Sequence, residues 1–257
     1  MKLSKMWLFS GLSVLALVAG AAAQDDSWKS VYIGGYAGAG IGHTDASMVT
    51  VFSPTGYFAA SSVPAIAALS PQHPESTNFT GGFQAGFNLQ TGHLVAGLEA
   101  DIGALNRSNT STASGTYPCC APTGFTVTQT ISTGWLATVR PRVGYAHGKA
   151  LFFVTGGLAI TDFKYQGHFT DTFATANEFS TLAENKAGWC FGGGMQYRLS
   201  KHWSLRGDYL HANFGQLRGV STNLTAFTPP IPFPTNSFLH RAEARADMVR
   251  FGFNVHF

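Results

Sequence analysis

The stretch Val249-Arg250-Phe251-Gly252-Phe253-Asn254-Val255-His256-Phe257 alternates apolar and non-apolar side chains up to the last residue. Successive side chains of a β-strand point to opposite faces, so the apolar set would share one face of a strand. An exposed apolar strand of this length templates aggregation unless its face and edge are covered. The stretch therefore predicts a β-strand that packs against a protein core or a membrane.

The same two-residue period recurs in seven further segments. They are residues 30–41, 79–89, 94–103, 135–145, 152–161, 189–199 and 203–209. Each segment has one bulky apolar face and one small or polar face. Pro141 interrupts the fourth segment, and because proline cannot donate to a strand ladder, we expect it at a bulge or an unpaired position.

The connections between these segments alternate strictly in length. Three connections contain short turns of only two to four residues, at 91–92, 146–149 and 200–202, whereas the long ones lie near residues 43–78, 105–130, 165–185 and 215–244. This rhythm is typical of a meander of antiparallel strands with all tight turns at one end. The sequence thus predicts an all-β protein, an eight-stranded antiparallel up-and-down barrel with four long loops at one rim.

Residue volumes indicate which face of the strands points inward. Eight strands enclose little space, so the small and polar set fits inside and the bulky set fits outside. The inward set also holds most charges, which would cost about 2 to 4 kcal/mol each if they faced lipid near mid-bilayer. The pattern predicts a transmembrane barrel with a side-chain-filled lumen. The expected lumen charge network consists of Glu99, Asp101, Arg140, Arg142, Arg198, Arg206, Asp208 and Arg250.

Aromatic residues near the ends of the segments are candidates for the girdles that mark membrane interfaces. Ordinary β-propensity, which also favours aromatic residues, is the alternative explanation. The candidates are Trp28, Tyr145, Trp189, Tyr197, Trp203 and Tyr209.

The amino terminus is typical of a secretory signal. Lys2 and Lys5 precede an apolar run from Met6 to Val18, and small residues follow at 21–23, as at a cleavage site. We expect residues 1–23 to be removed and residues 24–257 to form the barrel domain. Without the two lysines the formal charge falls from +3 to +1, which gives no reason to expect nucleic acid as a partner.

The three cysteines do not predict a disulfide framework. Cys119 and Cys120 are adjacent in a Thr- and Pro-rich segment, where a vicinal disulfide, a loop staple and free thiols all stay open. Two ligands without a nearby histidine do not make a zinc site. Cys190 lies in a strand pattern and is expected to be a small packed side chain.

Four segments together resemble a known family. They are residues 135–145 (WLATVRPRVGY), 153–159 (FVTGGLA), 188–189 (GW) and 203–210 (WSLRGDYL). They are similar to the small outer-membrane β-barrel proteins of alphaproteobacteria, commonly called porin family proteins. The likeness covers the chain from residue 24 except its long loops. The family usually has glycine at the position of Pro141 and often glutamate at the position of Asp208, so lumen packing is expected to differ there.

The resemblance implies export to the cell outer membrane of a Gram-negative bacterium. Outer-membrane lipids and the outer-membrane barrel assembly machinery are the implied partners; the partner of the loops is unknown. In such proteins the terminal aromatic strand is the signal that the assembly machinery reads. By resemblance, Phe253, Val255 and Phe257 would carry that signal here.

Three functions compete at this point. The first is a structural surface protein that contributes to outer-membrane integrity and presents long loops outside the cell. We prefer this hypothesis to a small-solute porin because side chains are expected to fill the lumen. The second is haemin-like ligand binding by loop histidines, for which the candidates are His43, His73, His168 and His240. The third is a lipid-modifying enzyme in which His211 would serve as a base for a serine or threonine across the barrel. We predict no enzyme activity, cofactor or metal site.

Overall fold

The computed structural model describes residues 27–73 and 75–257. The predicted signal peptide, residues 1–23, lies outside the described residues. The described ranges contain one short helix, α1, and ten strands, eight of them long. Their bounds are β1 (Ser30–Thr50), α1 (Ser62–Leu69), β2 (Ser76–Thr91), β3 (Leu94–Thr116), β4 (Gly124–His147), β5 (Ala150–Asp171), β6 (Asn177–Arg198), β7 (Trp203–Ser221), β8 (Thr225–Ala226), β9 (Ile231–Pro232) and β10 (Phe238–His256).

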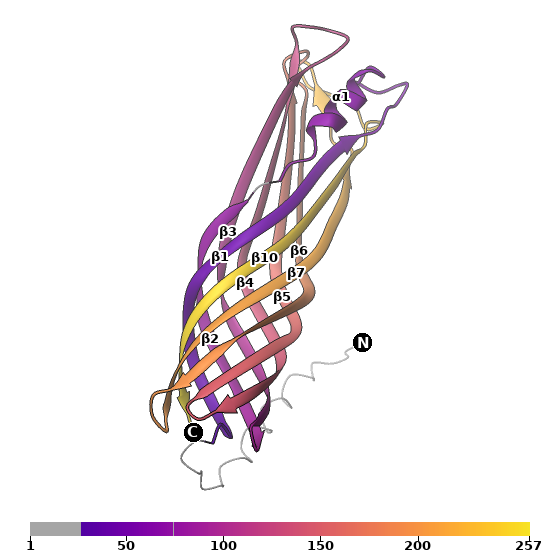
Figure 1. The fold of residues 1–257 in the computed structure, drawn as a ribbon. Coiled ribbons are helices and arrows are strands. Elements are labelled where there is room, and N and C mark those ends of the chain that lie inside the picture. Colours follow the sequence, from indigo (N-terminus) through magenta and orange to yellow (C-terminus); the bar gives the residue numbers. More distant parts are fainter. Residues whose placement is uncertain (1–26, 74) are drawn as a thin grey trace, which may run out of the picture.

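Each long strand pairs in antiparallel fashion with its neighbours along the chain. β10 closes the ring because it pairs with both β7 and β1, for example Val249 with Tyr209 and with Ala39. Gly92 and Gly148 occupy two of the tight turns with positive φ angles of 58° and 53°, a conformation that favours glycine. Figure 1 shows these turns at one end of an elongated barrel and α1 at the other. The predicted eight-stranded up-and-down barrel is confirmed.

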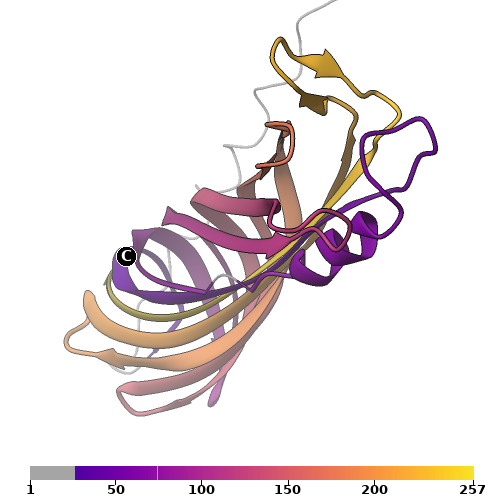
Figure 2. The ribbon, with the colours of Figure 1, turned by 90° about the horizontal axis from the view of Figure 1, so that it is seen from above.

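The long connections are more ordered than the sequence suggested. β1, β3, β5 and β7 continue well into the segments expected to be loops, and the following strands begin early. The parts of these four connections that lie outside the long strands are 51–75, 117–123, 172–176 and 222–237. The first of these segments contains α1 and the last contains β8 and β9, and both lie at the same end of the ring (Figure 2).

The polarity of the two strand faces reverses part of the way along the barrel. In the lower half of β5, exposed Val154 and Leu158 alternate with inward-facing residues, as predicted. Beyond Asp162 the period of two persists, but the outward residues are now polar and the inward ones are aromatic. The outward set is Asp162, Lys164, Gln166, His168 and Thr170, and the buried aromatic set is Phe163, Tyr165 and Phe169.

β10 shows the same reversal. Val249, Phe251 and Phe253 point outward below, whereas Asp247 and Arg245 occupy the outward face above them. Such a reversal is expected where the surroundings of a barrel change from lipid below to water above. The upper strands therefore form an extension that is apolar inside and polar outside.

We call the upper part, from the level of Asp247 to the loops, the extracellular extension. Its interior holds two apolar clusters of buried residues. The lower cluster includes Leu105, Phe163, Phe214 and Ala244. The upper cluster lies under the loops and includes Phe58, Ile66, Phe125, Phe169 and Phe238.

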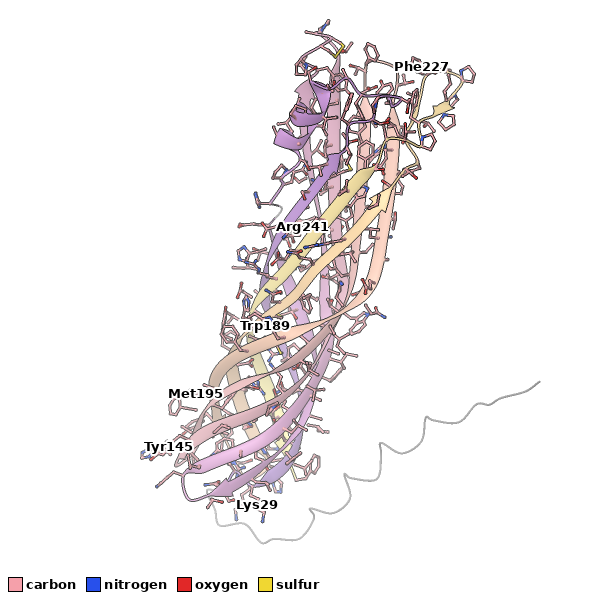
Figure 3. The ribbon with its side chains drawn as sticks, turned by 90° about the vertical axis from the view of Figure 1, so that its right-hand side faces the viewer. Lys29, Tyr145, Trp189, Met195, Phe227 and Arg241 are labelled. Atoms are coloured by element: carbon pink, nitrogen blue, oxygen red, sulfur yellow. A yellow bond between two sulfur atoms is a disulfide. The ribbon has the colours of Figure 1, made fainter. Side chains whose placement is uncertain are left out.

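Five of the six aromatic residues assigned to girdles lie outward. Tyr145, Trp189, Tyr197, Trp203 and Tyr209 are all exposed, with Tyr145 near the lower end and Trp189 about midway (Figure 3). Trp28 was wrongly assigned, because its side chain is fully buried. It packs in a small cluster with Val95, Ala146 and Leu151 at the end that carries the tight turns.

Pro141 lies where a break in the ladder was expected. The partner pairs between β4 and β5 run from Val139 with Leu158 to Arg142 with Thr155 and skip the two residues between. Towards β3, Pro141 stands opposite Leu98. Its missing N–H is therefore placed at an interruption of the ladder, in agreement with the prediction.

Within residues 27–73 and 75–257, no helix has both the length and the apolar character needed to cross a bilayer.

Candidate functional site

Seven of the eight predicted lumen charges form one continuous network inside the lower barrel. Glu99 of β3 lies at its centre. Its Oε1 accepts from Arg140 Nη2 at 2.7 Å, and its Oε2 accepts from Arg142 Nη1 at 3.3 Å. Arg206 Nη1 from β7 also donates to Oε2. One carboxylate thus joins three arginines from β4 and β7.

The network continues through Asp101 and Asp208. Asp101 accepts from Arg140 and, at 3.4 Å, from Arg250 Nη1. Asp208 accepts from Arg206 Nε at 2.8 Å and from Arg250 Nη2 at 2.6 Å. The side chains of these groups are at most 2% exposed. Pairing of this kind is what makes buried charge tolerable.

Aromatic residues complete the layer, and the sequence-based list omitted them. Tyr32 donates to Glu99 Oε2 at 2.6 Å, and Tyr36 donates to Asp101 Oδ1 at 3.4 Å. The guanidinium carbons of Arg142 and Arg206 lie 4.1 Å and 4.7 Å from the centroid of the Phe153 ring. The signal was present in the strand pattern, because Tyr32, Tyr36 and Phe153 occupy inward positions of β1 and β5.

Arg198, the eighth predicted residue, lies nearer the tight turns. Its Nη1 donates to the carbonyl of Ser27 at 2.5 Å, and its guanidinium lies 4.7 Å from the Trp28 ring centroid. Arg198 and Trp28 therefore belong to the lower closure of the barrel. The apolar clusters of the extracellular extension lie above the charged layer. Side chains thus fill the barrel at three successive levels.

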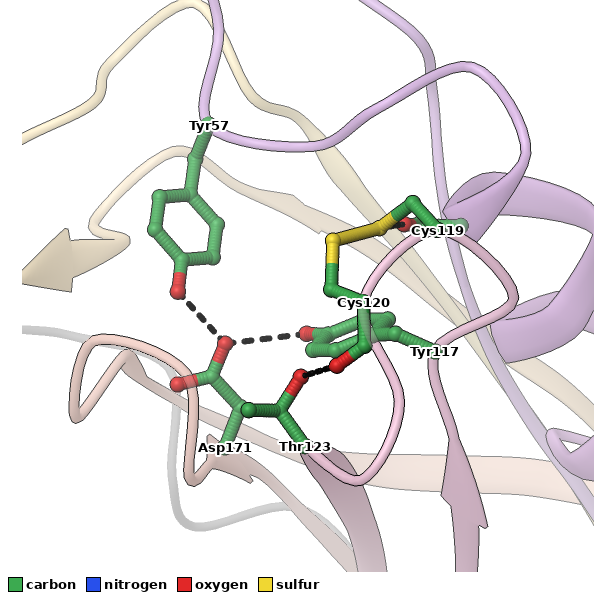
Figure 4. The surroundings of a disulfide bond; sticks show 7 residues. Tyr57, Tyr117, Cys119, Cys120, Thr123 and Asp171 are labelled. Atoms are coloured by element: carbon green, nitrogen blue, oxygen red, sulfur yellow. Dashed lines mark hydrogen bonds between the residues drawn. A yellow bond between two sulfur atoms is a disulfide. The ribbon is translucent and has the colours of Figure 1, made fainter.

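The loops are tied together by Asp171 at the end of β5 (Figure 4). Its Oδ2 accepts from the hydroxyls of Tyr57 at 2.6 Å and Tyr117 at 3.0 Å, and its Oδ1 accepts from the backbone N–H of Ala176 at 2.8 Å. Burial raises the pKa of both phenols, and Asp171 raises it further. Both hydroxyls stay protonated and serve as donors. Three separate connections converge on this carboxylate, and we call this assembly the extracellular cap.

The three cysteines are now assigned. Cys119 and Cys120 form a disulfide with each other in the turn between β3 and β4, beside the cap (Figure 4). Thr123 donates to the Cys120 carbonyl and holds the same turn. Cys190 is a buried free thiol that packs in the lower apolar cluster of the extension, as its strand position predicted.

The four histidines considered for haemin do not converge. His43 and His73 lie on the outer face, where they contact Glu75 and Asp45 respectively. His168 lies on the outward side of β5 beside Phe179. His240 is buried inside the extension. Among the described residues, no group of three histidine, cysteine or acidic side chains is arranged to hold a metal ion.

His211 does not face across the barrel as the enzyme hypothesis required. It occupies an outward position of β7, where its Nδ1 lies 2.7 Å from Asp247 Oδ1 and its ring packs beside Trp189 and Phe191. The interior positions next to it are Leu210 and Ala212. The hypothesis fails because β7 keeps its odd-numbered residues outside from Trp203 to Asn213, and its register shifts only after Asn213.

A different histidine does meet a serine inside the extension. His240 Nε2 lies 2.7 Å from Ser221 Oγ, which is within reach for a nucleophile and a base. Glu178, however, contacts the serine, with Oε1 2.5 Å from Oγ, while His240 Nδ1 faces the Tyr165 hydroxyl at 3.3 Å. A catalytic triad needs the carboxylate behind the histidine. The cluster instead links β5, β6, β7 and β10 as a structural chain of hydrogen bonds.

The residues assigned to the assembly signal lie at the tight-turn end of β10. Phe253 stacks on Trp203 at a centroid distance of 4.6 Å, Val255 pairs with Ile33, and the N–H of Phe257 donates to the Val31 carbonyl at 2.9 Å. Their role in assembly stays a prediction. Deletion of Phe257, followed by immunoblotting of outer-membrane fractions, would refute it if the amount of folded protein were unchanged.

Comparison with known proteins finds a matching family and relatives in sequence. The family model described as "Outer membrane protein beta-barrel domain" matches residues 10–257. The 31 kDa outer-membrane immunogenic protein of Brucella melitensis biotype 1 is 30% identical over 181 residues, which cover 70% of this chain and 66% of that protein. The chain thus spans slightly less than two thirds of this relative's length.

Two further similarities are more distant. The 22 kDa outer membrane protein of Rhizobium leguminosarum bv. viciae is 26% identical over 136 residues, or 53% of each chain. Among solved structures, the outer membrane protein OprG from Pseudomonas aeruginosa covers 91% of this chain and all of its own, with a TM-score of 0.45 and 9% identity.

Proposed function

Because the chain belongs to the outer membrane protein beta-barrel domain family and lies in the cell outer membrane, we propose that it is a structural surface protein with a lumen closed to solutes. The main observation behind this proposal is that two layers of different polarity, one above the other, fill the inside of the barrel. A charged layer around Glu99 fills the lower barrel, and an apolar core around Phe163 and Phe214 fills the extension above it. An ion that passed the first layer would meet a dehydrated second one.

We expect the purified protein to give no steady conductance in planar lipid bilayers. Opening the lower layer would require breaking several buried ion pairs at once, which is costly. The measurement is a single-channel recording at voltages that leave an open porin, used as the positive control, stably conducting. Large, steady and weakly selective currents from the correctly folded protein would contradict the closed lumen and favour the small-solute porin.

The same proposal assigns the extension and the extracellular cap to the outside of the cell. The outward residues of the upper strands are polar, as a surface in water requires, and the tight turns lie at the opposite end. The Brucella relatives are named outer-membrane immunogenic proteins, which supports surface exposure here. Antibodies raised against residues 222–237 should bind intact cells; binding only after permeabilisation would refute the orientation.

Lipids are the proposed partner of the lower outer face. Its exposed residues include Phe83, Val154, Leu158 and Phe251, and burying such side chains in hydrocarbon is the main source of stability for the barrel. A contribution to outer-membrane integrity follows from this role. Unchanged detergent sensitivity of cells that lack the protein would contradict that contribution.

A further inference from the structure

Arg107 is a buried arginine whose hydrogen-bond partners are all neutral. It points inward from β3, just above the bulge between Ala104 and Arg107, and is only 8% exposed. Its Nε donates to Ser76 Oγ at 3.2 Å and its Nη1 donates to the Arg245 carbonyl at 3.3 Å. The guanidinium lies over Gly42 of β1, where any Cβ atom would overlap it. No ion pair of Arg107 exists among the described residues.

The arginines of the lumen charge network, in contrast to Arg107, have carboxylate partners. Arg140, Arg206 and Arg250 are more deeply buried than Arg107, and each of them pairs with two carboxylates. Near Arg107 the candidate carboxylate is Glu75, but its Oε1 contacts His43 on the outer face instead. Burial without a counter-charge disfavours the charged form, and it lowers the pKa of Arg107. Because arginine stays protonated in proteins, a counter-charge is needed from elsewhere.

The guanidinium borders a small cavity lined mainly by groups that can donate hydrogen bonds. The polar lining comes from Thr44, Ser76, Asn109, Ser132 and Thr133 besides Arg107 itself. The cavity forms because β2 begins only at Ser76, while β1 and β3 continue upward on either side. Three of the five N–H groups of Arg107 are not used by the two hydrogen bonds described above.

A second, independent observation also indicates that a ligand binds in this cavity. The hydroxyl of Thr133 is buried and has no hydrogen-bond partner, although the residue is only 4% exposed. Buried hydroxyls without a partner are rare and call for an explanation such as a bound water or ion. The cavity leaves about 10 Å³ for the centre of a water-sized sphere, which is near the lower limit for one water molecule. Chloride is larger than water, so its binding would require the side chains that line the cavity to move apart slightly, whereas phosphate and sulfate are far too large.

We propose that this cavity is a binding site for one small monovalent anion of the size of chloride. Arg107 supplies the charge, and the hydroxyls of Thr44, Ser76 and Thr133 supply further donors. The bound anion compensates the guanidinium and fastens β3 to β1 and β10 in the extracellular extension. The site is separate from the lumen charge network, and the protein as it stands in the outer membrane would take the anion from the external medium.

The test is thermal unfolding of the full-length folded protein in detergent, with sodium chloride replaced by sodium gluconate at constant ionic strength. The midpoint should rise with the logarithm of the chloride concentration once this exceeds the dissociation constant, and the rise should be about 3 to 5 °C at ten times the dissociation constant. Bromide should replace chloride, and sulfate should not. Arg107→Gln should abolish the chloride dependence. Arg218→Gln removes an exposed arginine of β7 that contacts Gln216 and should keep the dependence.

Thr133→Val keeps the arginine and covers the case in which Arg107→Gln fails to fold. It should raise the chloride dissociation constant several-fold without removing the response. Crystals grown in bromide should show an anomalous peak beside Arg107 in the unmodified protein. A chloride response of the same size in all variants, or the absence of the bromide peak, would overturn the proposal.

Discussion

Replacing Glu99 with glutamine is expected to lower the free energy of unfolding by about 3 to 5 kcal/mol. The substitution keeps the shape of the side chain but removes a charge that Arg140, Arg142 and Arg206 share. Their guanidinium groups would then be left with too few carboxylates in a layer that water does not reach. Removing one partner of a buried ion pair is costly because the other charge stays buried.

The measurement is denaturant unfolding of the folded protein in detergent, followed by the heat-dependent shift in gel mobility. The matched control is Glu184→Gln in β6, which removes an exposed carboxylate that pairs with Lys186 at 3.3 Å. Exposed pairs contribute about 0 to 1 kcal/mol, so the control should change little. If Glu99→Gln lowered the free energy of unfolding by less than about 1 kcal/mol, the lumen charges would be hydrated. This result would contradict a lumen closed to solutes.

Replacing Phe169 with alanine should also cost about 3 to 5 kcal/mol, although the residue lies in a segment expected to be a loop. Phe169 is fully buried in the upper apolar cluster. Its ring centroid lies 5.4 Å from that of Phe58, 5.5 Å from that of Phe238 and 6.1 Å from that of Phe125. The substitution would leave a cavity among residues from β4, β5, β10 and the first loop.

The effect should be seen first above the membrane. Limited proteolysis of the intact protein should cut Phe169→Ala in residues 51–61 or 222–237 at protease concentrations that spare the unmodified protein. The control is Phe173→Ala in the turn after β5, where the ring is 53% exposed and less is lost. Equal protease resistance for Phe169→Ala and its control would show that the extension has no packed core.

The barrel could be predicted because one physical constraint repeats in every strand. Val154, Leu158, Phe251 and Phe253 point outward while their neighbours in sequence face a narrow lumen, so the alternation is strong and has the same sign in every strand of the lower barrel. The charges at Glu99 and Arg140 could be placed for the same reason, since lipid excludes them from the outer face. Their individual partners required the register between strands, which residue pattern alone does not supply.

The extension was missed because its alternation has the opposite sign. Phe163 and Tyr165 are buried while Lys164 and Gln166 face out, a pattern typical of a half-buried strand in a water-soluble protein. If every strand of the barrel is assumed to face lipid, this pattern marks the end of the barrel. If the upper part is assumed to face water, the same pattern continues the barrel strand. Trp28 was assigned to the wrong place because it is one aromatic residue at the end of a strand. Its sequence position cannot distinguish a side chain at the membrane interface from one that fills the lumen beneath Arg198.

The measurement that tests the reversal most directly is spin-label accessibility along the outward positions of β5 in lipid bilayers. Labels would replace Val154, Leu158, Lys164, Gln166 and His168 one at a time, in a Cys190→Ala background. Val154 and Leu158 should be accessible to oxygen and shielded from a water-soluble nickel complex. Lys164, Gln166 and His168 should show the opposite, with the crossover near Asp162. The same environment at all five positions, lipid or water, would contradict a barrel whose faces exchange polarity at the membrane surface.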